Sequence, residues 1–192
     1  AAEFLNRVYT NAWMKLPVGK ARYGLMLRED GIVMDDGTTT RISENHYHMT
    51  TTTAQAANVL SHLEYYLQIV WPELNVNVVS TTEQWAGAAI AGPKSRDMLS
   101  KLYPDLDVSN DALPFMGYKE AEFFGVPSRI FRISFSGELA YEINVKSDHG
   151  MFMWEKMMEV GKEFGNQPYG TEALSTLRIE MGHVAGPELD GR

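Results

Sequence analysis

The sequence predicts an α+β fold in which antiparallel or mixed sheets are faced by helices. Three observations predict it: apolar runs of strand length separated by glycine-containing turns, longer segments with helical periodicity between them, and an apolar fraction of 44% that can fill a core. The 192 residues suit one large domain, or one domain with part of a second. A polar loop in the middle of the chain predicts two subdomains, 1–105 and 112–192.

The amino-terminal half alternates helices with strands. Its strongest signal is the hairpin around Asp30-Gly31, because glycine accepts the positive φ that a tight turn between two apolar runs requires. A long amphipathic helix follows and ends before Pro72, since proline disfavours helical backbone in the residue before it. The elements expected are, in order, a helix at 2–9, strands at 23–27, 32–34 and 46–52, a helix at 54–70, and strands at 76–80 and 84–90.

The carboxyl-terminal half is expected to contain one further sheet. Three apolar runs joined by short turns with glycine predict consecutive strands. Two later segments repeat apolar residues at helical spacing, the first of them with Phe152, Trp154 and Met158. The elements expected are a helix at 94–102, strands at 118–124, 126–134 and 140–145, and helices at 151–164 and 172–181.

Composition excludes several classes of function. A net charge of −8 and a pI near 5.1 argue against binding to nucleic acid or to an anionic membrane, both of which need a basic face. The chain has no cysteine, which fits a cytoplasmic location, and no apolar run of transmembrane length. Both ends interrupt a pattern, the first inside a helical stripe and the last after Gly186-Pro187. We therefore expect a piece of a longer polypeptide, truncated at both ends.

Asp35-Asp36-Gly37, which directly follows the second predicted strand of the hairpin, is the first candidate site. Successive residues of a strand point to opposite faces, so one aspartate at most can share a face with the core or a pocket. Gly37 allows another segment or a ligand to approach the backbone closely. Taken alone, the pair is compatible with an ordinary solvated strand end.

Glu142 is the second candidate. It alternates with Tyr141 and Ile143 along a strand, which fits either a solvent-facing carboxylate or one that stands in a cleft floored by the sheet. In a cleft, a carboxylate can accept two parallel N–H bonds from a planar edge like that of guanidine, and pteridines present such an edge. His46 and His48 share a strand face, but no third histidine or cysteine lies near them, so we expect no metal site.

Five motifs in order resemble the tetrahydrofolate-binding aminomethyltransferase family, which includes the glycine-cleavage T-protein and the folate domains of sarcosine and dimethylglycine oxidases. The motifs span nearly the whole chain: FLNRVYTN (4–11), GKARY (19–23), DGIVMDD (30–36), SGELAYEI (136–143) and LRIEMG (177–182). Four further stretches resemble one branch, the folate domain in the α subunit of heterotetrameric sarcosine oxidases: ENHYHMTTTT (44–53), TEQWA (82–86), TEAL (171–174) and GHVAGPELDG (182–191).

The resemblance implies a T-protein-like folate-binding fold with a role for each matching residue. Asp36 matches the catalytic aspartate that meets the reactive N10 region of the folate. Glu142 matches the glutamate that clamps the pteridine. Three further positions match residues that line the site, and at one of them the family's tyrosine has lost its hydroxyl: Tyr23, His183 and Phe135.

Two departures separate this chain from the T-proteins. The arginine of the T-protein Ala-Arg-Asp motif falls on Leu174, and a strand-end asparagine becomes a threonine near Thr52, which we also count among the folate-binding residues. Both departures make the chain less similar to the T-proteins, and they argue against the T-protein chemistry that uses an amine carrier.

The implied activity is capture of a formaldehyde-level carbon from sarcosine as 5,10-methylenetetrahydrofolate. The chain lacks a dinucleotide-binding fingerprint. The resemblance therefore implies FAD or FMN and NAD only elsewhere in the full enzyme, with partners in the rest of the α subunit and in a flavin-bearing subunit. The alternatives are a stand-alone aminomethyltransferase or folate-dependent demethylase, and a folate-binding module without catalysis.

Overall fold

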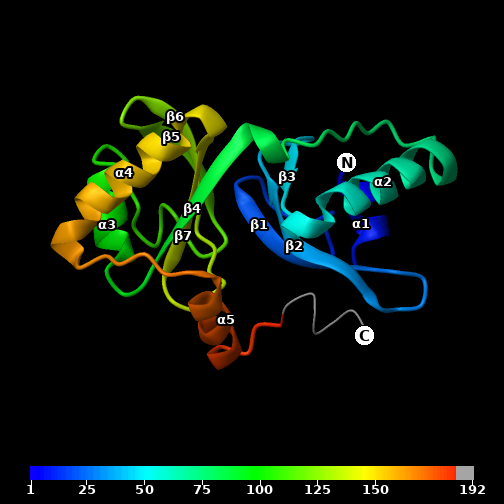
Figure 1. The fold of residues 1–192 in the computed structure, drawn as a ribbon. Helices are drawn as coiled ribbons and strands as arrows, with labels where there is room; N and C mark the ends of the chain where they lie inside the picture. Colours follow the sequence, from blue (N-terminus) through cyan, green and yellow to red (C-terminus); the bar gives the residue numbers. More distant parts are fainter. Residues whose placement is uncertain (185–192) are drawn as a thin grey trace. The chain divides into compact units, whose positions relative to one another are not determined.

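The computed structural model describes residues 1–184 and contains two compact units, Ala1–Thr82 and Glu83–His183, which are described separately below (Figure 1). Both units combine helices with an antiparallel sheet, as the α+β prediction requires. The units divide at Thr82, earlier than the loop at 106–111, because the strand at 85–91 belongs to the sheet of the second unit. The assignment of 1–105 and 112–192 as folate-binding subdomains stays a prediction.

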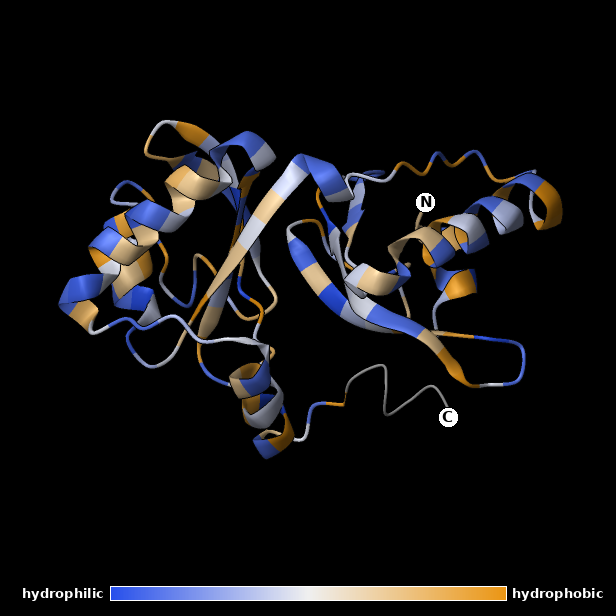
Figure 2. Ribbon diagram, viewed as in Figure 1, coloured by the Kyte–Doolittle hydropathy of each residue, from blue (hydrophilic) through white to orange (hydrophobic). Residues whose placement is uncertain are grey.

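The first unit is built on a three-stranded sheet in the order β1-β2-β3. β1 begins with the polar residues Lys20 and Arg22 and ends in the apolar run Leu25-Met26-Leu27, and Figure 2 shows hydrophobic colour at the end of the hairpin strands near their turn. The elements are α1 (Ala2–Val8), β1 (Lys20–Leu27), β2 (Val33–Arg41), β3 (Tyr47–Met49), a 3-10 turn (Thr53–Gln55), α2 (Ala56–Tyr65) and a π-helical turn (Tyr66–Val70).

The core of the first unit lies between α1, α2 and one face of the hairpin. Trp13 is fully buried there, and a Cβ on Gly24 of β1 would lie 2.6 Å from its ring. Gly24 is therefore the residue that lets the strand pack flat against the indole. The buried members are Phe4, Leu5, Tyr9, Trp13, Leu16, Met26, Val59 and Leu63.

The strand predicted at 76–80 is wrong. This segment is irregular, although Val76 and Val78 pack against the core while Val79 is 77% exposed. The alternation that predicted a strand is thus real, but burial of alternate side chains does not require a neighbouring strand to complete a ladder. The other predicted strands are present, and all but one end within three residues of their expected limits. The exception is the second strand of the hairpin, predicted at 32–34, which continues to Arg41, so that Asp35 and Asp36 lie within the strand and not at its end.

The second unit carries a four-stranded antiparallel sheet in the order β4-β7-β6-β5. Tyr141, Ile143 and Val145 of β7 are fully buried against α3 and α4, so the alternating residues Glu142 and Asn144 lie on the other face. The elements are β4 (Trp85–Ala91), α3 (Ser95–Leu102), β5 (Tyr118–Phe123), β6 (Val126–Phe131), β7 (Ala140–Lys146), α4 (Gly150–Gly161) and α5 (Thr171–Glu180), with 3-10 turns at Thr82–Gln84, Ser147–His149 and Lys162–Phe164.

None of the helices within residues 1–184 is long and apolar enough to cross a membrane. In the same part of the chain, no group of three or more histidine, cysteine or acidic side chains could hold a metal ion. Residues 185–191 of the GHVAGPELDG stretch lie outside the described residues.

Candidate functional site

The hairpin of the first unit places its two aspartates on opposite faces. Asp35 pairs with Met26 and points to the core, where it is 4% exposed. Asp36 pairs with Leu25 on the other face and is partly exposed. One carboxylate is therefore buried and the other is partly exposed, so only one of the two shares a face with the core, as the strand alternation predicted.

Asp36 is paired with Tyr23, the aromatic residue predicted to line the site. The Tyr23 hydroxyl donates to Asp36 Oδ2 at 2.7 Å across the β1–β2 ladder. Burial, and then the hydrogen bond to Asp36, raise the pKa of the Tyr23 hydroxyl well above its ordinary value. The phenol thus stays a proton donor at neutral pH and fixes one oxygen of the carboxylate.

Asp35 holds Thr52, another predicted site residue. The Thr52 amide lies 3.3 Å from each oxygen of the Asp35 carboxylate. A Cβ on Gly37 would lie 2.1 Å from the carbonyl oxygen of Thr50, so only glycine lets this segment pass close to β2. The close approach expected of Gly37 is thus a contact with the chain's own backbone, and it brings Thr52 to Asp35.

The environment of the Asp35 carboxyl disfavours its charged form. Burial raises its pKa above the usual aspartate range, and the hydrogen bonds from Thr52 only partly oppose this. No role for Asp35 was predicted beyond its place next to Asp36. The signal that could have found it is the same alternation, since the aspartate opposite the exposed one had to be buried.

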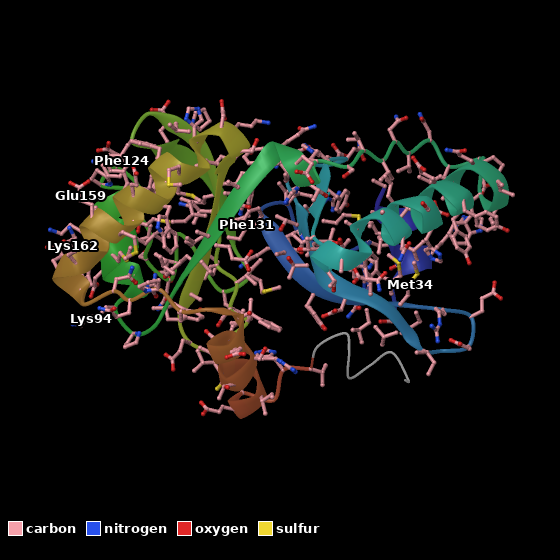
Figure 3. All side chains as sticks on the ribbon, viewed as in Figure 1. Met34, Lys94, Phe124, Phe131, Glu159 and Lys162 are labelled. Carbon is pink, nitrogen blue, oxygen red and sulfur yellow. The ribbon has the colours of Figure 1, made fainter. Side chains whose placement is uncertain are left out.

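In the second unit, Glu142 lies on the face of β7 that points away from α3 and α4. Its cross-strand neighbours are Ala89 of β4 and Phe131 of β6, the latter labelled in Figure 3. The side chain is partly buried, and burial raises the pKa of its carboxyl. Within residues 1–184 no hydrogen bond or ion pair reaches this carboxylate, so its oxygens are available to a donor from outside.

Phe135 and His183 lie together at the end of α5. Their ring centroids are 6.1 Å apart and their planes are inclined by 32°. Arg178 of α5 donates to the His183 carbonyl at 3.0 Å. Gly137 has φ +83°, and a Cβ there would lie 2.0 Å from Met181, so glycine permits the turn after Phe135 to pack on the end of α5.

The sequence reasoning missed the hydroxyls on both sides of Phe135. Ser134 and Ser136 each bury an oxygen that has no hydrogen-bond partner among the described residues. A buried hydroxyl without a partner costs free energy, and such groups in native proteins call for an explanation. The only signal in the sequence for these hydroxyls was the presence of two serines in the Ser-Phe-Ser-Gly turn.

The predicted site residues thus form two groups. Tyr23, Asp36 and Thr52 lie in the first unit, and Phe135, Glu142 and His183 in the second. Tyr23 contacts Asp36 in the first group, and Phe135 contacts His183 in the second. That the two groups meet at one folate stays a prediction.

Comparisons with known proteins agree with the fold and identify relatives of the chain. The chain is 57% identical to the sarcosine oxidase subunit alpha of Rhizobium meliloti (strain 1021) and 53% identical to that of Corynebacterium sp. (strain P-1), over its whole length but only 20% of either relative. It is 33% identical to the aminomethyltransferase of Chloroherpeton thalassium, over 99% of this chain and 51% of that protein.

A solved structure confirms the T-protein-like fold. The glycine cleavage system aminomethyltransferase T from Bartonella henselae superposes with a TM-score of 0.77, covering 95% of this chain and 46% of its own, at 22% identity. The sequence matches the GCVT N-terminal domain over residues 1–192. The chain therefore belongs to the GCVT N-terminal domain family.

Proposed function

We propose that the chain is the tetrahydrofolate-binding one-carbon transfer domain of a sarcosine oxidase α subunit. In this role it captures the carbon released by oxidative demethylation of sarcosine as 5,10-methylenetetrahydrofolate. The observation that carries the proposal is the identity of 57% with a sarcosine oxidase subunit alpha across the whole chain. The chain spans about a fifth of the length of that relative, so the amine oxidation is assigned to the rest of the enzyme.

Glu142 is proposed to clamp the pteridine. Its carboxylate lies on the open face of β7, partly buried and without a partner among the described residues. An acceptor-only group of this kind fits the two adjacent N–H donors of a pteridine edge, because two charge-assisted bonds would offset the cost of its burial. Phe135 and His183 offer aromatic faces on the same unit.

Asp36 is proposed as the catalytic base. When bound, tetrahydrofolate would supply the N5 and N10 nitrogens that take up the carbon. Asp36 would remove the proton that leaves the attacking nitrogen, and its charge would stabilise the cationic one-carbon donor. Tyr23 holds one oxygen of Asp36 at 2.7 Å and orients the carboxylate, while Asp35 and Thr52 fix the strand beside it. FAD or FMN and NAD are assigned to other parts of the enzyme.

Calorimetric titration with tetrahydrofolate tests the pteridine clamp. Glu142→Gln replaces one acceptor oxygen by a donor that faces a donor, and we expect an affinity about ten- to a hundredfold lower, corresponding to about 1.5–3 kcal/mol. The matched control is Glu122→Gln, an exposed carboxylate on β5 of the same sheet. Equal affinities of the parent and Glu142→Gln would return Glu142 to a solvent-facing role.

A free-standing aminomethyltransferase is the second candidate, favoured by the identity of 33% over 99% of the chain. The two candidates differ in their substrate. Sarcosine turnover with a flavin-bearing partner supports the first, and transfer from an aminomethylated carrier supports the second.

A further inference from the structure

The second unit has an open sheet edge beside a hollow, and neither is used by the proposed folate site. β4 is the last strand of the sheet, with β7 on one side and no strand on the other among the described residues. The hollow, of about 600 Å³, lies along this strand and is walled by α3, α4 and residues 164–169. Its size falls within the range of about 300–1,000 Å³ that is typical of binding sites.

Hydrogen bonding identifies which groups of β4 point outward. The Gly92 amide donates to the Leu139 carbonyl at 2.9 Å, so the pair Gly92–Leu139 is a hydrogen-bonded pair of the ladder. Such pairs alternate along an antiparallel ladder, and Ala88 and Ile90 therefore bond to β7. The N–H and C=O groups of the intervening residues Gly87 and Ala89 point away from the sheet.

β4 carries no charged residue, no proline and no bulge. Edge strands are usually blunted by charges, proline or bulges. The sequence of β4 is Trp-Ala-Gly-Ala-Ala-Ile-Ala, uncharged and without proline, and its register with β7 runs unbroken through all seven residues. Its small side chains also leave room for a second backbone at the usual spacing of about 4.8 Å.

The walls of the hollow are suited to side chains of an incoming strand. Trp154, Met157 and Met158 of α4 and Met98 of α3 line it, and Trp154 is 45% exposed. Lys94, labelled in Figure 3, is the charged residue of the lining, and no ion pair involves it within residues 1–184. The site therefore offers backbone groups, an apolar pocket and one positive charge.

We propose that β4 and this hollow take up an extended segment supplied by the rest of the enzyme, added as a fifth strand of the sheet. Its backbone pairs with the outward groups of Gly87 and Ala89. An apolar side chain fills the hollow against Trp154, and a carboxylate of the segment meets Lys94. The source of the segment rests on the proposed function, because the sarcosine oxidase relatives contain about five times the length of this chain. Strand addition to an open edge is a common mode of peptide recognition.

Hydrogen–deuterium exchange in the complete enzyme, resolved to single amides, tests the proposal with an internal control. The Ala88 and Ile90 amides bond to β7 in either case and should be protected. If a fifth strand is present, the Gly87 and Ala89 amides exchange as slowly as these neighbours. If the edge is free, they exchange at least about tenfold faster, and the proposal fails.

Two pairs of variants of the complete enzyme test whether the added segment contacts the hollow. Trp154→Lys and Lys94→Glu should speed exchange at Gly87 and Ala89 at least about threefold. The controls Met151→Lys and Lys162→Glu lie on or next to α4 but outside the hollow, and should leave exchange unchanged. Equal effects of variants and controls, or protection that appears only as the enzyme self-associates in sedimentation, would overturn the assignment.

Two measurements on the same samples test the two proposals independently. Methylenetetrahydrofolate formation reports on the proposed function, and exchange at β4 reports on the fifth strand. Fast exchange with normal product formation would reject the strand alone, while protection without product formation would reject the function alone.

Discussion

Substitution of Asp35 tests the structural role of one aspartate of the pair without changing Asp36, the proposed catalytic residue. Asp35 is 4% exposed and accepts the Thr52 amide in a part-buried hydrogen bond, which Asp35→Ala removes. The expected loss is about 1–3 kcal/mol in the free energy of unfolding. Asp35→Asn keeps a carbonyl oxygen for Thr52 and removes the buried charge, so this variant should be at least as stable as the parent at pH 7.

The pH dependence of stability follows from the raised pKa of the Asp35 carboxyl. Because the folded state binds this proton more tightly than the unfolded chain does, ionisation of Asp35 opposes folding. The parent should therefore lose stability relative to Asp35→Asn as pH rises from the ordinary aspartate pKa, about 3.9, through the raised folded pKa. Within that window the slope is at most about 1.4 kcal/mol per pH unit, and above it the difference is constant.

Urea unfolding of the parent and both variants between pH 3.5 and 8, followed by circular dichroism, measures these differences. Subtracting the Asp35→Asn curve removes the contribution of the other carboxylates. An Asp35→Asn variant that is less stable than the parent at pH 7, or a difference that grows in the opposite direction with pH, would refute a buried and strained Asp35. Unchanged stability of Asp35→Ala would refute the anchoring of Thr52.

Four further predictions follow from the same geometry. Asp36→Ala in the complete enzyme should leave sarcosine oxidation intact but lower methylenetetrahydrofolate formation by about two to four orders of magnitude, with free formaldehyde accumulating instead; product partition measures this, and normal transfer to folate would contradict it. Tyr23→Phe should lower the same transfer step by about tenfold or less with little change in unfolding free energy, since only the orientation of Asp36 is lost. Gly37→Ala should destabilise the first unit by about 1–3 kcal/mol in urea unfolding, because its Cβ would lie 2.1 Å from the Thr50 carbonyl, whereas Gly170→Ala, with nothing within 4 Å, should be near neutral. Tetrahydrofolate affinity should rise with pH through the raised pKa of Glu142, because only the carboxylate accepts both N–H bonds, and calorimetry of Glu142→Gln should lack this dependence.

Local patterns were enough to predict most elements, and the reasons are visible in particular residues. Asp30-Gly31 produced a hairpin because Gly31 takes φ +82°. Tyr141, Ile143 and Val145 alternated into the core, which placed Glu142 on the open face. The segment 76–80 failed because whether a strand forms depends on a partner strand, which its own sequence does not specify.

Alternation predicted that only one of the two aspartates shares a face with the core, whereas the long-range contacts of the candidate site had no signal in the sequence. The pairing of Tyr23 with Asp36 requires the register of β1 on β2, thirteen residues apart in sequence. The anchoring of Thr52 by Asp35 requires a segment beyond β3 to pass over Gly37. Neither contact has a local signature, because the residues of each pair are brought together only by the folded sheet.

The pleat of β2 explains how two adjacent aspartates acquire different environments without any specialised loop. A catalytic carboxylate must reach its ligand and yet be held rigidly, and a single residue on a flexible loop satisfies only the first requirement. Here Asp36 stands on a strand whose next residue toward the amino terminus is fixed in the core by Thr52, while Tyr23 holds Asp36 from the neighbouring strand. Since a shift of one residue in the β1–β2 register would exchange the faces of Asp35 and Asp36, the packing of Met26 and Gly24 on the core side also determines which aspartate is exposed. The geometry of the proposed base therefore depends on the hydrophobic core beneath it.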